Sequence, residues 1–201
     1  MTRLGMVIDL KRCILCESCS TACKSEKATP PDIFYRRVLN VEIGKYPFTK
    51  NIILPVQCMH CKDPPCLKAC PSGAISQRSD GIVLIDENKC VGCRLCITEC
   101  PYGAISFYED IRGYYPGYMT PYEEVGYKRH KVGVVGKCDF CAERLDMGWK
   151  PACVQTCPTE AIHIGDLDDP NSEVSKLIKE RRGWLRLYEE YNTDPSVYYL
   201  L

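Results

Sequence analysis

Short apolar runs, each bounded by turn-forming residues, recur along the first half of the chain and predict strands rather than long helices. One of them contains Asp80-Gly81 between two apolar segments, which predicts a tight hairpin. Two others are separated by a turn. The predicted strand regions are residues 4–10, 36–43, 51–56, 74–86 and 104–108.

The pattern changes after residue 170, where apolar positions recur at helical spacing. Asn171 or Ser172 would cap the first turn of this helix. The apolar face would be formed by Val174, Leu177 and Ile178. The residues that follow, which include Trp184 and Tyr198-Tyr199, show no clear period, and we expect an irregular tail lying against the body or a partner.

Composition narrows the possible functions. Basic and acidic residues balance at 26 each, so no charge excess favours nucleic acid or an anionic membrane surface. The first ten residues lack the apolar run of a signal peptide, and no segment approaches the roughly 18 apolar residues of a membrane span. We therefore expect either a soluble chain or one that is attached to membranes only through partners.

Cysteine dominates the chemistry: 16 cysteines fall into four groups of four. The third group, Cys90 to Cys100 followed by Pro101, has the C-x₂-C-x₂-C-x₃-C-P spacing that binds [4Fe–4S] clusters. The first group repeats it with Lys24 in place of proline, and the others have one longer gap. The groups are Cys13, Cys16, Cys19 and Cys23; Cys58, Cys61, Cys66 and Cys70; Cys90, Cys93, Cys96 and Cys100; Cys138, Cys141, Cys153 and Cys157.

Three groups end in the same way, with cysteine, proline, two further residues and Ala-Ile. These segments begin at Cys70, Cys100 and Cys157. In each we expect the cysteine to open a short helical turn and the Ala-Ile pair to enter a strand. The fold is therefore predicted to consist of repeated cluster-binding units.

Disulfides and zinc are the alternative interpretations of so many cysteines. A secreted disulfide framework leaves the repeated Cys-Pro endings unexplained and lacks a signal peptide. Zinc favours two separated pairs of ligands, whereas three groups here supply three or four thiolates within a short window. Iron–sulfur clusters are favoured, and sixteen thiolates divide evenly into four [4Fe–4S] clusters.

The ligand sets follow from two-cluster ferredoxins, in which the last cysteine of a group binds the other cluster. The second and third groups are neighbours in sequence and form one pair, which leaves the first and fourth as the other. Cluster a would take Cys13, Cys16, Cys19 and Cys157; cluster b Cys138, Cys141, Cys153 and Cys23; cluster c Cys58, Cys61, Cys66 and Cys100; cluster d Cys90, Cys93, Cys96 and Cys70.

This pairing predicts an α+β fold of two interleaved bacterial-ferredoxin-like [4Fe–4S] units, the second inserted in the first, with irregular loops and a C-terminal tail. The insertion between them carries five tyrosines among glycines, prolines and charges, which suits either a solvated loop or a docking surface. The expected parts are 1–50 with 133–170 (first unit), 51–108 (second unit), 109–132 (Tyr-rich insertion) and 171–201 (helix and tail).

Other candidate residues carry weaker signals. His60, His130 and His163 could be ligands, but the thiolate count is already complete, so structural roles are expected. Four cations lie beside the cysteines, where a positive charge would raise a cluster's reduction potential, although ordinary solvated side chains are the default interpretation. They are Lys62, Lys68, Arg94 and Lys137. No phosphate loop, nucleophile motif or open metal site is present, so we expect electron transfer and no catalytic site of the chain's own.

The four spacings, in this order, resemble the electron-transfer (beta) subunit of molybdopterin oxidoreductases, such as the DMSO, polysulfide/thiosulfate and respiratory arsenate reductases. The resemblance runs from Leu4 to about Ile178 and includes Asp63-Pro-Pro-Cys66, Cys100-Pro-Tyr-Gly and Gly165-Asp-Leu-Asp-Asp-Pro170. It implies four clusters between a catalytic subunit with a molybdenum or tungsten bis-pterin cofactor and a quinone-reactive membrane anchor.

In such proteins the clusters of the first and fourth groups lie nearer the catalytic subunit. The resemblance also implies a peripheral subunit of a membrane-associated complex. Export with a signal-bearing partner would place it on the periplasmic or outer face, although a cytoplasmic position also fits. The alternatives are a polyferredoxin-like subunit of a hydrogenase or formate-oxidising complex, and a soluble ferredoxin-type carrier.

Overall fold

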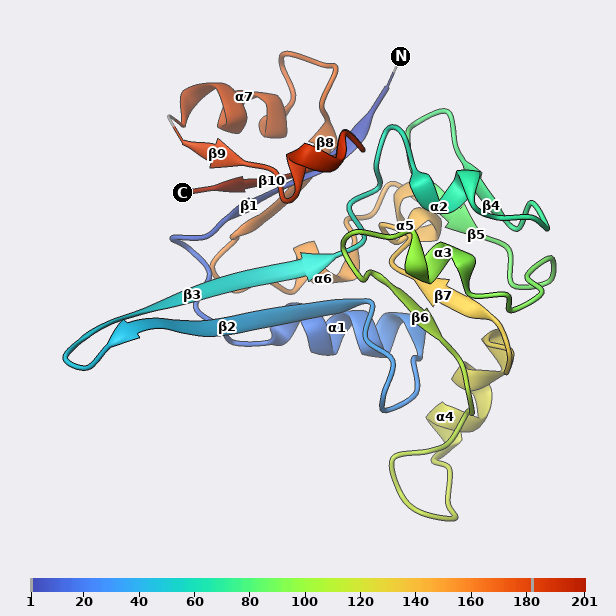
Figure 1. Ribbon diagram of the computed structural model, residues 1–201. Helices are drawn as coiled ribbons and strands as arrows, with labels where there is room; N and C mark the ends of the chain where they lie inside the picture. Colours follow the sequence, from blue (N-terminus) through green and yellow to red (C-terminus); the bar gives the residue numbers. More distant parts are fainter. Residues whose placement is uncertain (1, 182) are drawn as a thin grey trace.

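The computed structural model describes residues 2–181 and 183–201 and shows a body of short elements from which one long hairpin projects (Figure 1). The strands are β1 (Leu4–Asp9), β2 (Arg36–Lys45), β3 (Phe48–Gln57), β4 (Ile75–Gln77), β5 (Val83–Ile85), β6 (Ile105–Phe107), β7 (Val135–Lys137), β8 (Ile162–Asp166), β9 (Trp184–Leu185) and β10 (Val197–Leu200). The helices are α1 (Ser18–Lys27), α2 (Pro65–Lys68), α3 (Leu95–Thr98), α4 (Pro121–Gly126), α5 (Ala142–Asp146), α6 (Ala152–Gln155) and α7 (Glu173–Glu180).

A sheet of order β8-β1-β10-β9 joins the two ends of the chain (Figure 1). Strand β1 pairs antiparallel with β8 and parallel with β10, and helix α7 packs on the sheet. Val7, Val174 and Leu200 meet in this contact and are fully buried. The predicted helix after residue 170 is confirmed as α7, and the Ser172 hydroxyl caps it by accepting a hydrogen bond from the Ser175 N–H.

The expected irregular tail is wrong at its end, because Tyr198-Tyr199 belong to strand β10. This strand lies between β1 and β9, and Val197, Tyr199 and Leu200 are completely buried. Its partner β1 comes from the opposite end of the chain, so local periodicity near residue 198 gave no sign of the pairing. A final strand of four residues is also too short for a period to show.

The remaining strands form three antiparallel pairs: β2–β3, β4–β5 and β6–β7. The predicted strands at 36–43 and 51–56 are confirmed as β2 and β3, although both extend further than expected. The hairpin expected at Asp80-Gly81 is confirmed as β4–β5, and strand β6 is found within residues 104–108.

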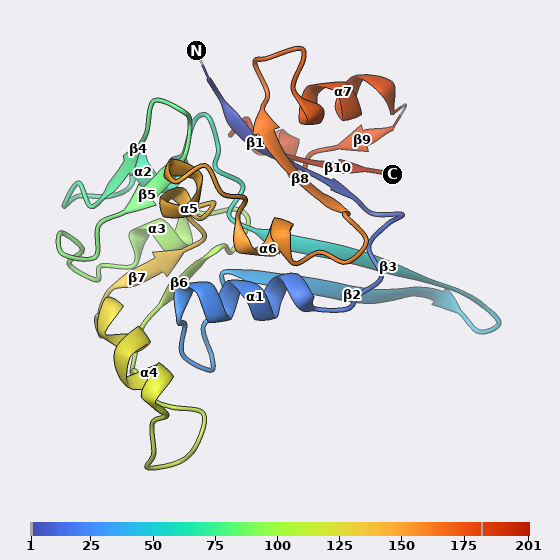
Figure 2. The ribbon, with the colours of Figure 1, turned by 180° about the vertical axis from the view of Figure 1, so that it is seen from behind.

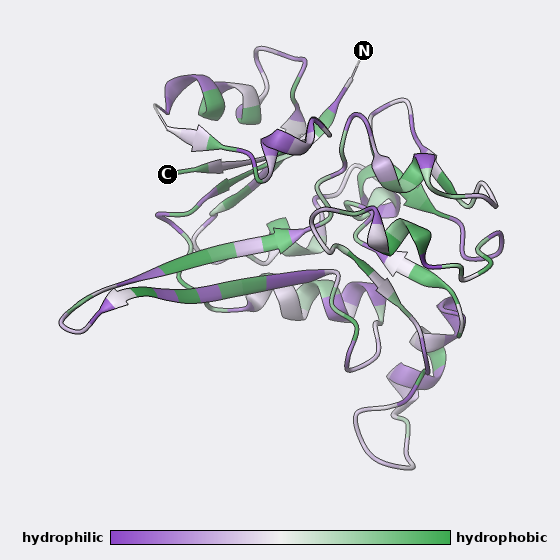
Figure 3. Ribbon diagram, viewed as in Figure 1, coloured by the Kyte–Doolittle hydropathy of each residue, from purple (hydrophilic) through white to green (hydrophobic). Residues whose placement is uncertain are grey.

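Hairpin β2–β3 extends well beyond the body, as both views show (Figures 1 and 2). Its outer part carries large apolar side chains exposed to solvent, and it contains hydrophobic stretches along both strands (Figure 3). At the tip, Tyr46 is 93% and Phe48 88% exposed. We call residues 39–52 the arm; its other exposed apolar residues are Leu39, Val41, Ile43 and Ile52. Such a projecting apolar surface is typical of a protein contact.

The Tyr-rich insertion contains a helix where the sequence predicted only a loop or surface. Thr120 caps α4 through a capping box with Glu123, and Tyr127 is buried beside Glu123. The Tyr122 hydroxyl donates a hydrogen bond to the Ser25 carbonyl of α1. The insertion is therefore anchored to the body, while Tyr114, Tyr115 and Tyr118 remain exposed.

Pairing crosses the expected unit boundaries at two places. Strand β7, within 133–170, pairs with β6, within 51–108. Hairpin β2–β3 spans the boundary at residue 50. No helix in residues 2–181 or 183–201 is both long and apolar enough to cross a bilayer.

Candidate iron–sulfur centres

Four cavities, which we name a to d, are each lined by four cysteines from two groups. Cavity a is lined by Cys13, Cys16, Cys19 and Cys157; cavity b by Cys23, Cys138, Cys141 and Cys153; cavity c by Cys58, Cys61, Cys66 and Cys100; cavity d by Cys70, Cys90, Cys93 and Cys96. In each cavity, three cysteines come from one group and the fourth is the last cysteine of another. All sixteen thiols are brought into such sets and none forms a disulfide.

The cavities suit a multi-iron group. The four cavities are of similar size. Within the part of the chain that is described, no three histidine, cysteine or acidic side chains converge as they would round one ion. Tetrahedral zinc needs sulfurs about 2.3 Å from a common centre. Four thiolates arranged round an open space instead match the donor set of a [4Fe–4S] cluster.

Each cavity is built by a loop with the same backbone turn. The residue before the second cysteine of every group is in the left-handed region, with φ of 59° at Leu15, 43° at His60, 69° at Gly92 and 53° at Phe140. Three of these residues have side chains, so the conformation costs free energy that the surrounding fold must offset. At Gly92 a side chain is also sterically excluded, because a Cβ atom would lie 2.1 Å from the Gly133 carbonyl oxygen.

A short helix then presents the third cysteine of every group. Cys19, Cys66, Cys96 and Cys153 are each the second residue of their helix. The turn expected at each Cys-Pro motif is confirmed, because the carbonyls of Cys70, Cys100 and Cys157 accept a hydrogen bond from the N–H three residues later. The helices themselves end before these cysteines. Proline cannot donate the backbone hydrogen bond of a continuing helix. Because Lys24 replaces it in the first group, α1 continues through Cys23 to Lys27.

Burial makes most of the thiols weak acids in the absence of iron. It raises the pKa of Cys66 to about 12 and that of Cys61 to about 11. At exposed Cys16, by contrast, hydrogen bonds to Ser18 lower the pKa. Iron binds thiolates, so loading the buried sets must displace protons.

Contacts connect cavity a with b, b with c, and c with d. Cys19 of cavity a and Cys153 of cavity b flank the same buried side chain, Arg36. Cys138 of cavity b lies near Cys58 of cavity c. Cavities c and d share an apolar core that contains Cys66 and Cys96.

Of the cations expected beside the cysteines, Lys137 is buried, whereas Lys62, Lys68 and Arg94 are exposed. Lys68 pairs with Asp63 at 2.6 Å, and the Arg94 guanidinium lies 3.6 Å from the Phe107 ring centre. Lys137 lines cavity c and donates to backbone carbonyls of Val83 and Cys138.

The three histidines have partners other than a metal. His60 is fully buried, stacks on Phe140 and accepts a hydrogen bond at Nδ1 from the Val83 N–H, 3.0 Å away. Burial and the nearby Lys137 lower its pKa well below the ordinary value, so it is neutral. His130 bridges Glu87 and the Lys27 carbonyl, and His163 pairs with Glu173.

Arg36 is a buried cation that the sequence analysis did not single out. A signal was present: Arg36 and Arg37 are consecutive at the start of a predicted strand, and successive side chains of a strand point to opposite faces. The two side chains therefore point to opposite faces of the strand, and the structure buries that of Arg36.

Comparison with known proteins also indicates an iron–sulfur protein. The sequence matches the family described as 4Fe-4S dicluster domain over residues 49–114 and 118–167. It is 46% identical to the B component of selenate reductase from Mesobacillus selenatarsenatis, covering 97% of this chain and 70% of that protein. It is 38% identical to the arsenate respiratory reductase iron–sulfur subunit of a Shewanella strain, covering 98% and 96% respectively. It is 37% identical to the B component of anaerobic dimethyl sulfoxide reductase from Escherichia coli, covering 84% and 76%.

The expected resemblance is thus confirmed, and mixed helices and strands build ferredoxin-like cluster domains as anticipated. The sixteen cysteines fit four [4Fe–4S] clusters. The protein belongs to the family of iron–sulfur electron-transfer (beta) subunits of molybdopterin oxidoreductases.

Proposed function

We propose that cavities a to d hold clusters a to d through the four sets of cysteines described above. Electrons would pass along this series between a molybdenum or tungsten bis-pterin catalytic subunit at cluster a and a quinone-reactive membrane anchor at cluster d. One observation supports a and d as the two ends of the series: the exposed cysteines are Cys16, in cavity a, and Cys93, in cavity d. The two inner cavities have no exposed ligand.

The surface at each end supports contact with a partner. Ile14 beside Cys16 is 60% exposed, and Val91 beside Cys93 is 68% exposed. Apolar side chains beside a redox centre exclude water when another protein covers them. We propose that each end docks a different subunit.

The arm and the insertion lie next to these two ends of the series. The arm begins at cavity a, since Val38 and Pro55 line that cavity, and we propose that it contacts the catalytic subunit. The insertion ends near cavity d, because the carbonyl of Gly133, the residue that follows it, lies close to Gly92 of the third cysteine loop. We propose that its exposed tyrosines contact the membrane anchor.

When bound, each cluster supplies one-electron storage. The protein's residues hold the clusters by their thiolates, set the spacing and keep water from the inner sites. Because β1 pairs with β8 and α1 packs on α6, we propose that the first and fourth groups form one ferredoxin-like unit, with the second and third groups inserted as another. Residues 1–50 with 133–170 and residues 51–108 remain our proposed units, with 109–132 and 171–201 as additions.

The substrate of the complex would be set by the catalytic subunit, since relatives of this chain serve selenate, arsenate and dimethyl sulfoxide reductases. We propose that the protein is a peripheral subunit of a membrane-associated complex. We favour the outer face of the membrane, which the chain would reach by export together with a partner.

Anaerobic purification of the tagged chain from its native membranes tests this proposal, with iron, molybdenum and tungsten quantified in the co-eluting complex. Roughly sixteen irons on this chain, together with a large molybdenum- or tungsten-containing partner, is the expected result. Full iron with neither metal would favour the hydrogenase-type subunit or the free carrier instead.

A further inference from the structure

Arg36 is a buried cation without a counter-charge. Its side chain, 2% exposed, starts strand β2 and points into the core. The Nη1 group donates to the Gln57 side-chain oxygen at 2.9 Å and lies 3.5 Å from the Met6 sulfur. Neither is negatively charged, so the guanidinium is solvated by neutral groups alone.

Two of its nitrogen atoms have no partner at all. Nε and Nη2 are buried and donate no hydrogen bond in the described structure. A buried ion without pairing is strongly destabilising, and folded proteins almost always supply a partner. These N–H groups therefore need an acceptor that belongs to the loaded protein.

The surroundings identify that acceptor. Arg36 forms part of the wall of cavity b, and its Nη1 lies 3.9 Å from the sulfur of Cys153. The Cys19 thiol of cavity a is also close to the guanidinium. A cluster held by four thiolates is anionic and gains a further negative charge on reduction. The unpartnered donors thus lie between two sites that would both hold anions.

We infer that Arg36 is a positioning residue shared by iron–sulfur sites a and b, whose fixed positive charge and free N–H groups raise the reduction potentials of both. The inference rests on the proposed ligand sets. A cation between two sites favours the extra electron on either, because it lowers the energy of both reduced states. Arginine suits this place because it stays charged at every physiological pH and offers donors in several directions.

The test compares Arg36→Met, Arg36→Lys and Arg37→Met in the complete complex. Arg37 is the matched control, since it is the next residue of the same strand, loses the same charge, and is exposed. Each variant is first assayed for iron content. Reduction potentials are then measured by EPR-monitored redox titration, with signals assigned through Cys→Ser variants of each set.

We expect Arg36→Met to lower the potentials of clusters a and b so that their reduced fraction at fixed potential falls about tenfold, which is about 59 mV for one electron. Clusters c and d should keep their potentials, and Arg36→Lys should restore most of the loss. Arg37→Met should change none of them. Unchanged potentials of a and b in an iron-replete Arg36→Met protein would overturn the inference.

Loss of iron in Arg36→Met is also informative. If Arg36→Lys keeps the iron that Arg36→Met loses from a and b, a cation is required there, as inferred. If both variants lose it equally, the site needs the shape of arginine rather than its charge, and the inference fails. Wrong ligand sets would be revealed separately, because the Cys→Ser variants would then remove signals in other combinations.

Discussion

The buried ammonium group of Lys137 donates a hydrogen bond to the backbone carbonyl of Val83, 54 residues earlier in the chain. The same Nζ donates to the Cys138 carbonyl at 2.9 Å. One side chain therefore ties hairpin β4–β5 to the loop that carries the fourth cysteine group, at the wall of cavity c.

Lys137→Met should destabilise the protein and lower the potential of cluster c. Two carbonyls lose their donor, which costs about 1–3 kcal/mol when a buried acceptor is left unpaired. Anaerobic denaturation followed by circular dichroism measures the first effect, and redox titration the second. Lys62→Met, at an exposed lysine beside Cys61, is the control and should change neither. Equal effects of the two substitutions would contradict a special role for Lys137.

Cys100→Ser should disturb the cluster of cavity c rather than that of its own group. Cys100 lines the cavity of Cys58, Cys61 and Cys66, although the other cysteines of its own group line cavity d. We expect loss of about one quarter of the iron, or a changed EPR signal, for this cluster alone. Cys70→Ser is the reciprocal control and should affect cluster d. Loss of the signal of the Cys90 set in Cys100→Ser would refute the crossed arrangement.

Substitutions on the arm and on the insertion should each weaken the binding of a different partner. Tyr46→Ser with Phe48→Ser should weaken retention of the catalytic subunit roughly tenfold or more, because exposed aromatic residues dominate many interfaces. Tyr115→Ser with Tyr118→Ser should do the same for the membrane anchor.

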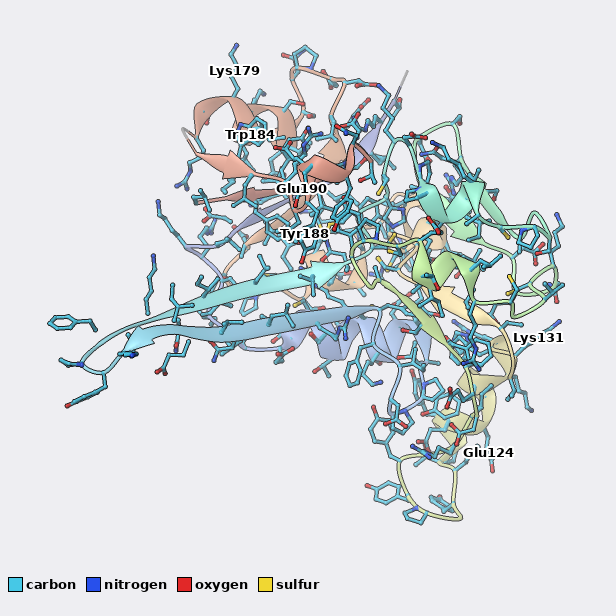
Figure 4. The ribbon with its side chains drawn as sticks, viewed as in Figure 1. Glu124, Lys131, Lys179, Trp184, Tyr188 and Glu190 are labelled. Atoms are coloured by element: carbon cyan, nitrogen blue, oxygen red, sulfur yellow. The ribbon has the colours of Figure 1, made fainter. Side chains whose placement is uncertain are left out.

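Each pair of substitutions is the control for the other, and iron content should be normal in both. Molybdenum or tungsten measures the first partner, and the co-purifying membrane subunit measures the second. Tyr191→Ser provides a further control. Tyr191 is exposed and follows Glu190 in sequence, and Glu190 lies far from Glu124 of the insertion (Figure 4). Reversed or identical losses would disprove the assignment of the two ends.

Tyr199 should be important for stability although it lies close to the end of the chain. Its ring is fully buried and its hydroxyl donates to the Pro55 carbonyl at 2.9 Å. Tyr199→Ala should lower the free energy of unfolding by about 3–5 kcal/mol, and Tyr199→Phe by about 1 kcal/mol. Thermal unfolding measures both. A midpoint for Tyr199→Ala equal to that of the parent would show that β10 does not stabilise the body.

Asp194 should make stability depend on acid pH. Burial alone would raise its pKa, but hydrogen bonds and charge from Arg3 and Arg186 hold the pKa below its ordinary value. Its contribution is therefore present above the unfolded pKa of about 3.9 and is lost as the pH falls through the lower folded pKa. The partly exposed pair should contribute no more than about 1 kcal/mol.

Asp194→Asn should thus destabilise the protein at neutral pH, and its difference from the parent should shrink as the pH falls below the unfolded pKa. Asp168→Asn, at an exposed carboxyl group, is the control and should leave the profile unchanged. A parent and an Asp194→Asn variant with parallel profiles through this acid range would show that the ion pairs do not couple folding to protonation.

Local sequence determined much of this protein, because cysteine spacing and turn chemistry act over a few residues. The grouping of sixteen thiols, the β4–β5 hairpin at Asp80-Gly81 and the cap of α7 could all be predicted in this way. The Cys-Pro repeats also marked the start of strands β4, β6 and β8.

Tertiary structure alone decided what depends on residues distant in sequence. Strand β10 exists because β1 supplies its partner from the other end of the chain, and Lys137 is buried because Val83 and Cys138 meet round it. Arg36 lies between two cavities whose nearest thiols, Cys19 and Cys153, are 134 residues apart by their numbers. Such contacts arise only when the chain closes long loops, and no local period records them.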